Sequence, residues 1–258
     1  MTSPRLHVDV AGSGPLVVLA HGFAGSARNF GPQARALRDR WRVLRYDARG
    51  HARSEAPDDP SAYTPGTFAD DLGRVFDGVA VVGGLSMGAA TALGFALQHP
   101  ERVRGLVLAA FPPGRESGRG MTAQALPFAD AIERDGLEAA GARFVWGQGS
   151  GLDPEAARLV RKGFLEHPPH GLVHTLRGVL ARQPSAEDLV SQLRRLDVPA
   201  LVIVGERDPG SLGSSRVLAN ALSGARLEVV PGAGHVVNLA DPVAFNARLR
   251  AFLQGLSE

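Results

Sequence analysis

The stretch from Val81 to Pro100 constrains the fold more than any other part of the chain. It reads VVGGLSMGAATALGFALQHP: an apolar run, a serine between two glycines, and then small and apolar residues that fit a helix. Ser86 therefore lies where a strand must turn sharply into a helix. Such a reversal crowds the backbone, and residues two positions away must be very small, because a β-carbon would collide across the turn. Gly84 and Gly88 meet that requirement.

Short apolar runs alternate with helical segments along most of the chain. We expect Thr64 to cap a helix that begins at Pro65, and Met87–Gln98 to form another. This alternation is typical of an α/β fold with a mostly parallel sheet and helices on both faces, and it leaves room for an antiparallel edge at the first strands. The segment Leu6–Pro15 is predicted as a strand that runs into a Gly/Pro turn, and the other predicted strands are Leu16–Ala20, Trp41–Asp47, Val79–Gly84, Val103–Phe111, Ala200–Gly205 and Leu227–Val230.

One segment interrupts the alternation. From about Gly114 to Ser185 the sequence shows only helical periodicity, and Asp153-Pro154-Glu155 is a good helix start. We therefore expect a core domain made of residues 1–113 and 186–258, with a helical cap inserted at 114–185.

The composition fits a globular protein of this kind and excludes several classes of function. The chain has 258 residues, of which 44% are hydrophobic and 21% charged, so a large core is expected. It has no cysteine, which excludes disulfides, thiolate metal sites and cysteine nucleophiles. The net charge is only +2 and the arginines are scattered among acidic residues, so we expect no nucleic-acid partner.

The sequence also shows no membrane signal. No apolar stretch reaches the roughly 20 residues that span a bilayer, and the first residues, MTSPRLHVDVAGSG, lack the apolar run of a signal peptide. We expect a cytoplasmic protein that has no membrane partner.

The position of Ser86 suggests a chemical role for its hydroxyl. Ligands of an open parallel sheet bind at the carboxyl ends of the strands, where Ser86 is expected. The helix that begins at Met87 points free N–H groups and its positive dipole end toward the same place. Strand, Gly-x-Ser-x-Gly and helix together form the pattern of a nucleophile elbow. A serine in an ordinary glycine turn is the alternative, and the partner residues decide between the two.

A serine nucleophile needs a base, and His235 is our candidate. Elbow enzymes place the acid and then the histidine after the serine in the chain. His235 follows the last predicted strand in a glycine-rich loop, PGAGH. The other histidines precede the serine or come too early after it: His7, His21, His51, His99, His167, His170 and His174.

Two acidic residues follow the penultimate strand. Asp208 has left the strand and can reach the histidine loop, whereas we expect Glu206 to be a solvated or turn residue. Asp197 precedes its strand and falls at the wrong edge of the sheet, and Asp241 caps the last helix. We therefore predict Asp208 as the residue that orients His235, with an Asp-Pro turn as its alternative role.

Acyl transfer also needs two backbone donors for the developing oxyanion. One is the N–H of Met87, directly after the serine. The other is expected from Phe23, because Gly22 lets this backbone approach closely. His21 is interpreted as a packed turn residue rather than a second base.

At this point the chain resembles the α/β-hydrolase superfamily, in its serine-nucleophile branch with a helical cap. The matching segments, in order, are AHGFAG, YDARGHARS, GLSMGAA, HPERVRGLVL, VPALVIVGERD and PGAGHVVNLADP. The resemblance implies an eight-stranded sheet, a cap, the triad Ser86, Asp208 and His235, and the oxyanion donors Phe23 and Met87. Ala52 and Ala89 stand where glycines are usual, and both are small.

Departures from the pattern separate the chain from neighbouring groups. Dehalogenases and epoxide hydrolases of this fold use an aspartate nucleophile, and epoxide hydrolases add cap tyrosines that this sequence lacks. Proline iminopeptidases have an HGGPG-like loop, whereas this sequence reads HGFAG. Carbon–carbon bond hydrolases of aromatic degradation usually carry tryptophan directly after the histidine. Val236 stands there instead, which argues against the last group without excluding it.

The sequence thus predicts a cofactor-free, metal-free serine hydrolase acting on a small carboxylic ester, lactone or thioester. A carbon–carbon bond hydrolase or lyase that uses the same triad and a non-catalytic ligand receptor are the alternatives. Arg143, Arg161 or Arg177 could instead clamp a substrate carboxylate. Candidate residues of the acyl pocket are Phe128, Phe144, Trp146, Phe164 and Leu172, each of which could equally be cap core.

Overall fold

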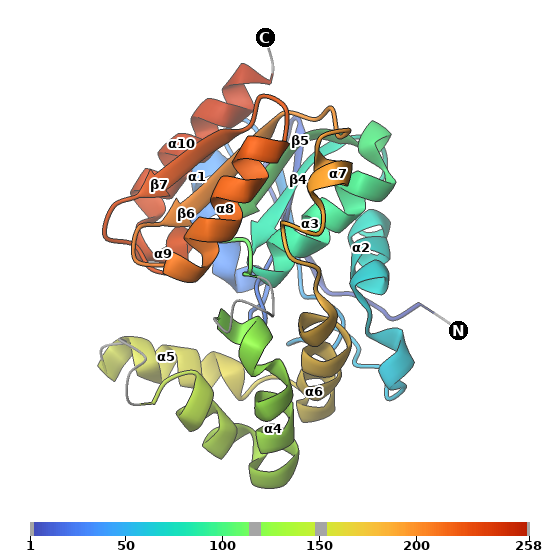
Figure 1. Ribbon diagram of the computed structural model, residues 1–258, viewed down its shortest axis with the longest axis vertical. Helices are drawn as coiled ribbons and strands as arrows, with labels where there is room; N and C mark the ends of the chain where they lie inside the picture. Colours follow the sequence, from blue (N-terminus) through green and yellow to red (C-terminus); the bar gives the residue numbers. More distant parts are fainter. Residues whose placement is uncertain (1–2, 114–119, 148–153, 257–258) are drawn as a thin grey trace.

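The computed structural model describes residues 3–113, 120–147 and 154–256. Its centre is a seven-stranded sheet with the strand order β1-β3-β2-β4-β5-β6-β7 (Figure 1). Strand β1 pairs with β3 antiparallel, and every other pairing is parallel. The strands are β1 (Val8–Ala11), β2 (Leu16–Ala20), β3 (Arg42–Tyr46), β4 (Ala80–Leu85), β5 (Val103–Ala109), β6 (Ala200–Gly205) and β7 (Arg226–Val230).

The central strands are apolar on both faces because helices cover both faces of the sheet. Every residue of β2, β4 and β6 is buried, whereas the edge strands β1 and β7 are partly exposed. Successive side chains of a strand point to opposite faces, so that Val17 and Val18 of β2 enter two different buried clusters. The long apolar runs of the sequence are therefore strands between two layers of helices.

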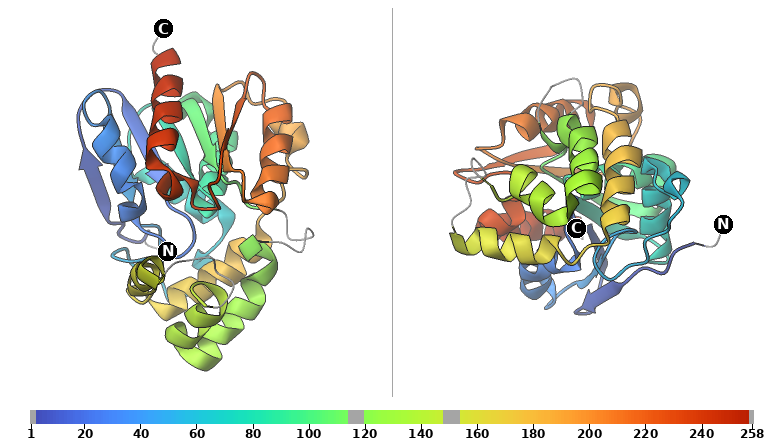
Figure 2. Two further views of the ribbon diagram at one scale, coloured as in Figure 1. Left: turned by 90° about the vertical axis from the view of Figure 1, so that its left-hand side faces the viewer. Right: turned by 90° about the horizontal axis from the view of Figure 1, so that it is seen from below.

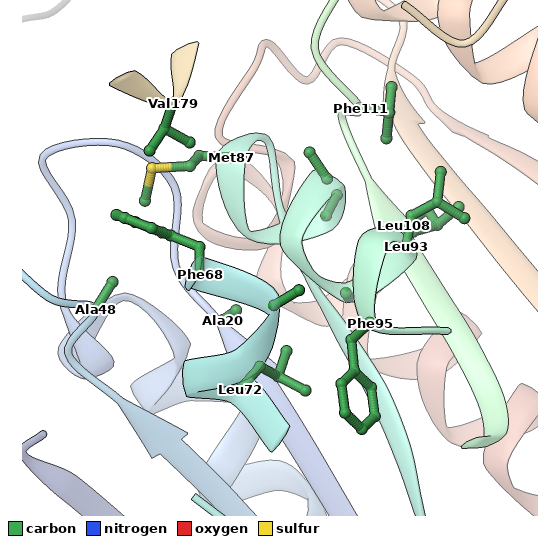
Figure 3. Close-up of a cluster of buried hydrophobic side chains, with 14 of the residues drawn as sticks. Ala20, Ala48, Phe68, Leu72, Met87, Leu93, Phe95, Leu108, Phe111 and Val179 are labelled. Carbon is green, nitrogen blue, oxygen red and sulfur yellow. The ribbon is translucent and has the colours of Figure 1, made fainter. Parts of the chain in front are cut away.

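The two layers differ in which helices they contain. On one face lie α2 (Pro65–Arg74), α3 (Met87–Gln98) and α8 (Pro209–Ala221), whose apolar residues share one cluster. Figure 3 shows members of this cluster from α2 and α3. On the other face lie α1 (Gly31–Leu37) and α10 (Pro242–Gly255), as Figure 2 shows. Predicted caps are confirmed, since Thr64 accepts from Thr67 N at the start of α2 and Asp241 accepts from Ala244 N at the start of α10.

Three helices, which we call the inserted helices, lie together at one end of the sheet (Figures 1 and 2). They are α4 (Gly120–Phe144), which is interrupted by a positive φ of 79° at Gly136, α5 (Pro154–Phe164) and α6 (Pro169–Gly178). The segment between α5 and α6 contacts the loops that follow β2 and β3. The inserted helices therefore cover the carboxyl ends of the parallel strands. The first expected cap boundary, at residue 114, lies outside the described residues.

The eight-stranded sheet that the resemblance implied is wrong for the described residues, which form seven strands, one for each strand predicted from the apolar runs. The first strand is shorter than expected, because the residues before Val8 bind the loop after β3 instead of pairing in the sheet. The carbonyl of Arg5 accepts from Glu55 N at 3.0 Å, and that of His7 accepts from Asp47 N at 2.9 Å. A turn with positive φ at Gly12 and Gly14 then leads directly into β2.

Candidate active site

Ser86 occupies a strained turn between β4 and α3. Its φ of 55° and ψ of −116° lie in a region that L-residues rarely adopt. A β-carbon on Gly84 would overlap the backbone of Gly88, and one on Gly88 would overlap the carbonyl oxygen of Ala20 in β2. The two glycines are therefore required by the close approach of three backbone segments, which is the strand-to-helix reversal predicted from the sequence.

The surrounding backbone holds Ser86 but leaves its hydroxyl free. Its N–H donates to the carbonyl of Ala109 at 2.9 Å, and its carbonyl accepts from Ala90 N at 3.0 Å. The side chain does not cap α3, although Ser86 is the residue that precedes this helix. Within the described parts of the chain the hydroxyl makes no hydrogen bond, so it is available to another molecule.

His235 and Asp208 meet at the carboxyl edge of the sheet. Nδ1 of His235 lies 2.6 Å from Oδ2 of Asp208, while Oδ1 of Asp208 accepts from Ser211 N at 3.2 Å and caps α8. The Asp208 side chain is only 12% exposed and that of His235 is 45% exposed. The Asp208 side chain is thus largely enclosed by the protein, whereas nearly half of the His235 side chain is open to solvent.

The loops that carry this pair are tied to each other by their backbones. The N–H of Arg207 donates to the carbonyl of Ala233 at 2.9 Å, and a β-carbon on Gly205 would overlap the carbonyls of Ala233 and Gly234. Glu206, the acid that sequence reasoning set aside, accepts from Gly232 N at 2.8 Å and anchors the histidine loop. The approach of the two loops explains why Asp208 rather than Glu206 reaches His235.

Asp208 is held in its ionised form. Burial raises the pKa of this carboxyl, but the hydrogen bond and charge of His235 and the hydrogen bonds from Ser211 outweigh it, so the net pKa lies below the ordinary value of 3.8. An ionised Asp208 can only accept, which places the ring proton of His235 on Nδ1. Nε2 of His235 is then left as a proton acceptor.

The structure brings two of the three predicted triad residues into contact. Asp208 and His235 are hydrogen-bonded, but no hydrogen bond joins Ser86 to His235 in residues 3–113, 120–147 and 154–256. Ser211 also lies near the pair, with Oγ 3.4 Å from Nδ1 of His235. Sequence reasoning missed Ser211, because its position depends on α8 turning its first residues toward the histidine.

The loop after β2, which we call the β2 loop (residues 21–26), runs beside Ser86. A β-carbon on Gly22 would lie 3.3 Å from the carbonyl oxygen of Leu85 and 3.5 Å from Cβ of Ser86. Phe23, predicted as an oxyanion donor, follows Gly22 directly. The side chain of Met87, the other predicted donor, is buried in the cluster that contains Phe68 (Figure 3), so only its backbone can serve the site.

His21 is a packed turn residue, as expected. Its Nδ1 lies 2.7 Å from the carbonyl oxygen of Gly22, and its Nε2 accepts from Ala48 N at 2.9 Å. Burial lowers its pKa to about 4, against weaker opposing effects of Gly22 and Asp47. A neutral imidazole with both nitrogens bonded cannot act as a second base, and it fixes the start of the β2 loop.

Four of the five predicted pocket residues, Phe128, Phe144, Trp146 and Phe164, form an aromatic column among the inserted helices. Phe128 stacks on Phe144 with ring centroids 4.6 Å apart and on Phe164 at 5.9 Å, and Trp146 meets Phe164 edge-on at 5.4 Å. Phe128, Phe164 and Leu172 are fully buried. Their packing is that of cap core, the alternative left open by the sequence.

The aromatic column nevertheless reaches the β2 loop. Phe128 contacts the ring of Phe23 edge-on, with centroids 5.9 Å apart, and the outer members Phe144 and Trp146 are only half-buried. Of the five predicted pocket residues, Phe128 thus has a direct contact with the loop beside Ser86.

The three arginines considered as carboxylate clamps differ in their surroundings. Arg161 donates to Glu138 at 2.7 Å, and Arg177 pairs with both Asp130 and Glu133. Arg143 instead lies over the ring of Phe144, 5.0 Å from its centroid. Arg161 and Arg177 are therefore engaged in surface ion pairs, and Arg143 is the one that packs on the aromatic column.

Among the residues that the structure describes, no group of three or more histidine and acidic side chains is arranged to hold a metal ion. No helix in this described part of the chain combines the length and apolarity needed to cross a membrane. The expected cytoplasmic location stays a prediction.

The chain is similar in sequence and in fold to known proteins. A sequence model of the alpha/beta hydrolase family matches residues 17–248. A Bacillus subtilis (strain 168) protein, provisionally named 2-succinyl-6-hydroxy-2,4-cyclohexadiene-1-carboxylate synthase, is 32% identical over 98% of this chain and 97% of its own. The pimeloyl-[acyl-carrier protein] methyl ester esterase of Nitrosomonas europaea is 31% identical over 93% of this chain and 96% of its own.

A solved structure supports the same relationship. The enol-lactonase from Burkholderia xenovorans LB400 superposes with a TM-score of 0.84 and 28% identity, covering 97% of both chains. The likeness therefore includes the inserted helices as well as the sheet.

Proposed function

This chain belongs to the alpha/beta hydrolase family, and from that premise we propose that it is a serine hydrolase that cleaves carboxylic esters through an acyl-enzyme on Ser86. The observation that carries the proposal is the 2.6 Å contact between Asp208 and His235. It lies at the same sheet edge as a strained serine whose hydroxyl is free among the described residues. The nucleophile Ser86, the orienting acid Asp208 and the base His235 follow one another in the chain order of elbow enzymes.

In the first half of the reaction Ser86 attacks the ester carbonyl carbon. Nε2 of His235 takes the hydroxyl proton as the new C–O bond forms, and the carbonyl becomes a tetrahedral oxyanion. Asp208 holds the Nδ1 proton of His235 and stabilises the imidazolium that results. The imidazolium then gives its proton to the departing alcohol, which leaves the acyl group on Ser86.

The backbone N–H groups of Phe23 and Met87 are the proposed donors to the oxyanion. Met87 begins α3, so its N–H has no acceptor within the helix. The β2 loop places Phe23 beside Ser86, on the side of Gly22. Donors fixed by the backbone before the reaction need no rearrangement when the charge develops, and each is worth about a hundred- to a thousandfold in turnover.

Water completes the cycle. His235, neutral again, takes a proton from water, and the resulting hydroxide attacks the acyl carbon. The second tetrahedral oxyanion collapses, Ser86 recovers its proton from His235, and the carboxylic acid leaves. The proposed mechanism uses no cofactor and no metal ion.

We place the substrate between the core and the inserted helices, and we propose residues 114–185 as a cap on a core of 1–113 and 186–258. The contact of Phe128 with Phe23 supports a largely apolar acyl site. A small or medium acyl group is the proposed substrate class, with lactones and thioesters included because they present the same carbonyl. The esterase and the enol-lactonase among its relatives support this range.

A panel of p-nitrophenyl esters of increasing acyl length tests the proposal. We expect hydrolysis of the short and medium esters, and loss of that activity in Ser86→Ala. Ser61→Ala, which removes an exposed hydroxyl that donates to Asp59 at 2.7 Å, is the matched control and should retain activity. Inactivity of the wild-type protein on every ester would refute the proposal.

A carbon–carbon bond hydrolase or lyase is the second candidate. The observation in its favour is the similarity to the Bacillus subtilis protein, whose provisional name is that of a synthase. A dienol-ketone substrate assayed beside the ester panel separates the two. Turnover of the ketone alone would select the second candidate, and absence of both activities would favour a ligand receptor.

A further inference from the structure

His167 joins the inserted helices to two loops of the core. It lies between α5 and α6 and is only 4% exposed. Its Nδ1 accepts from Ala52 N at 2.8 Å, and its Nε2 lies 2.9 Å from the carbonyl oxygen of Ala24. Ala52 belongs to the loop after β3 and Ala24 to the β2 loop, so that one side chain links three segments.

The hydrogen-bond partners fix the tautomer of this imidazole. A backbone N–H can only donate, so Nδ1 of His167 must be the unprotonated nitrogen. The ring proton is therefore on Nε2, where it donates to the carbonyl of Ala24. Both nitrogens of a neutral His167 are satisfied, and burial, the main effect, lowers its pKa and keeps it neutral.

Both partners of His167 are strained. Ala24 has a φ of 53° and Ala52 a φ of 45°, in the left-handed region that favours glycine. Only four described residues other than glycine have positive φ, and Ser86 is another of them. Such conformations persist where surrounding contacts hold them. The hydrogen bonds of His167 are contacts of this kind.

The strained Ala24 lies next to the proposed oxyanion donor. The Ala24 carbonyl shares a peptide with the N–H of Gly25, which donates to the carbonyl of Gly22 at 3.0 Å. Because the Gly22 carbonyl shares its peptide with the N–H of Phe23, a shift of the first peptide is passed to that N–H through this hydrogen bond. The ring of His51, 5.4 Å from that of His167 and 5.8 Å from that of Phe23, closes the space between them. His167 is thus connected to the region of Phe23 in two ways, through the backbone of the β2 loop and through the ring of His51.

We propose that His167 is a positioning residue, which holds the β2 loop from the inserted helices so that the N–H of Phe23 points at the oxyanion. The inference rests on the proposed function of Ser86 and Phe23. Stabilisation of the oxyanion then depends on the position of the inserted helices, because His167 lies between α5 and α6 and the carbonyl that accepts its hydrogen bond, that of Ala24, lies in the core.

The chain offers a matched control in the same segment. His170 lies three residues further along in α6, and its Nε2 is 3.1 Å from the carbonyl oxygen of Ala56. It also ties the inserted helices to the loop after β3, but it does not bond the β2 loop. Removing His170 should therefore leave the oxyanion donor in place.

The test compares His167→Phe, His167→Gln and His170→Ala with the wild-type protein. Phenylalanine keeps a ring and removes both hydrogen bonds, whereas glutamine keeps one donor and one acceptor. The measurements are kcat and KM on p-nitrophenyl acetate and the Ki of an aryl trifluoromethyl ketone, which forms a tetrahedral adduct on the serine. For His167→Phe we expect kcat to fall about 10- to 100-fold and Ki to rise by a similar factor, with KM within about twofold, since a displaced donor loses part of its effect. His167→Gln should fall between it and the wild type.

The outcomes separate the inference from the function on which it rests. An active wild-type protein together with a folded His167→Phe variant of unchanged kcat and Ki would overturn the inference alone. A wild-type protein that neither hydrolyses the ester nor binds the ketone would overturn both. If His167→Phe does not fold, the wild-type protein decides by proton NMR. The Nε2–H resonance of His167 should shift when the ketone binds while the ring signals of His170 stay in place, and an unmoved His167 resonance would refute the inference.

Discussion

Asp208 uses its two carboxylate oxygens for different partners: Oδ2 binds Nδ1 of His235 at 2.6 Å, and Oδ1 accepts from Ser211 N at the start of α8. The helix thereby fixes the carboxylate, and the carboxylate fixes the ring. Replacing Asp208 by asparagine keeps the shape but allows the amide to donate to Nδ1, which moves the ring proton of His235 to Nε2. We expect kcat on p-nitrophenyl esters to fall about ten-thousandfold.

Glu206→Gln is the control for that variant. It removes a carboxylate two residues away, yet the amide oxygen can still accept from Gly232 N. Its kcat should stay near that of the wild type. Equal losses in both variants would show that negative charge near the loop, rather than the hydrogen bond to His235, is what matters.

Gly88→Ala should damage the turn at Ser86. The new β-carbon would overlap the carbonyl oxygen of Ala20. Because this backbone belongs to a packed central strand, moving it would cost free energy of folding. We expect the free energy of unfolding in urea to fall by about 1–3 kcal/mol and esterase activity to be lost.

Gly94→Ala, in the same helix α3, should have the opposite sign. Its β-carbon would meet only the Cβ of Ala69 at 3.8 Å, which is ordinary contact. Alanine favours a helix interior over glycine by up to about 1 kcal/mol, so this variant should be more stable than the wild type. A loss of stability like that of Gly88→Ala would contradict the steric account of the turn.

Three buried histidines predict how stability depends on pH. Burial lowers the pKa of His21 to about 4 and also lowers those of His51 and His167, while the charges of Asp47 and Glu166 act in the opposite direction on His167. Below their ordinary value of 6.5 the unfolded chain binds protons that the folded protein excludes. We therefore expect the contribution of these histidines to the free energy of unfolding to be fully present above about pH 6.5. As the pH falls toward 4, the free energy of unfolding should decrease by up to about 1.4 kcal/mol per pH unit for each histidine.

Urea unfolding at several pH values between 4.5 and 7.5 measures this slope. His51→Phe removes one of the three groups, and its Nε2 has no partner among the described residues to lose. The free energy of unfolding of the variant should change less steeply with pH than that of the wild type, because two buried histidines contribute to the slope instead of three. An unchanged slope would mean that His51 titrates normally in the folded protein.

The buried ion pair between Arg49 and Asp71 should contribute to the stability of the loop after β3. Arg49 donates to both oxygens of Asp71, at 2.6 and 2.8 Å, and also to the carbonyl of Thr67 in α2. Arg49→Met leaves the buried carboxylate with Arg74 as its remaining arginine partner. We expect a loss of about 3–5 kcal/mol in urea unfolding, and a smaller loss when Asp71→Leu is added. A double variant that is less stable than Arg49→Met would contradict this reasoning.

Most of the fold was predictable because local patterns determine it. The strands Leu16–Ala20 and Ala200–Gly205 and the helix Met87–Gln98 have the bounds expected from their apolar runs and flanking residues. The seven apolar runs predicted as strands correspond to β1–β7, but the bounds of the first strand were not predictable, since whether the residues before Val8 pair in the sheet depends on contacts with Asp47 and Glu55, which are distant in the sequence.

The site, like the fold, contains residues that could be predicted from the sequence and residues that could not. Asp208 and His235 could be predicted, because each follows a strand and parallel strands deliver their loops to one edge. The contact between Ser86 and His235 stays a prediction. His167 could not be selected from the sequence, because it is one of three histidines in a helical segment and only the packing of that segment brings it to Ala24.

The most direct test of the account is the site of covalent labelling by a fluorophosphonate, measured by intact mass and peptide mapping. The account predicts one adduct per chain on the peptide that contains Ser86, much slower labelling in His235→Ala, and none in Ser86→Ala. An adduct on another residue, or labelling that is undiminished in Ser86→Ala, would contradict it.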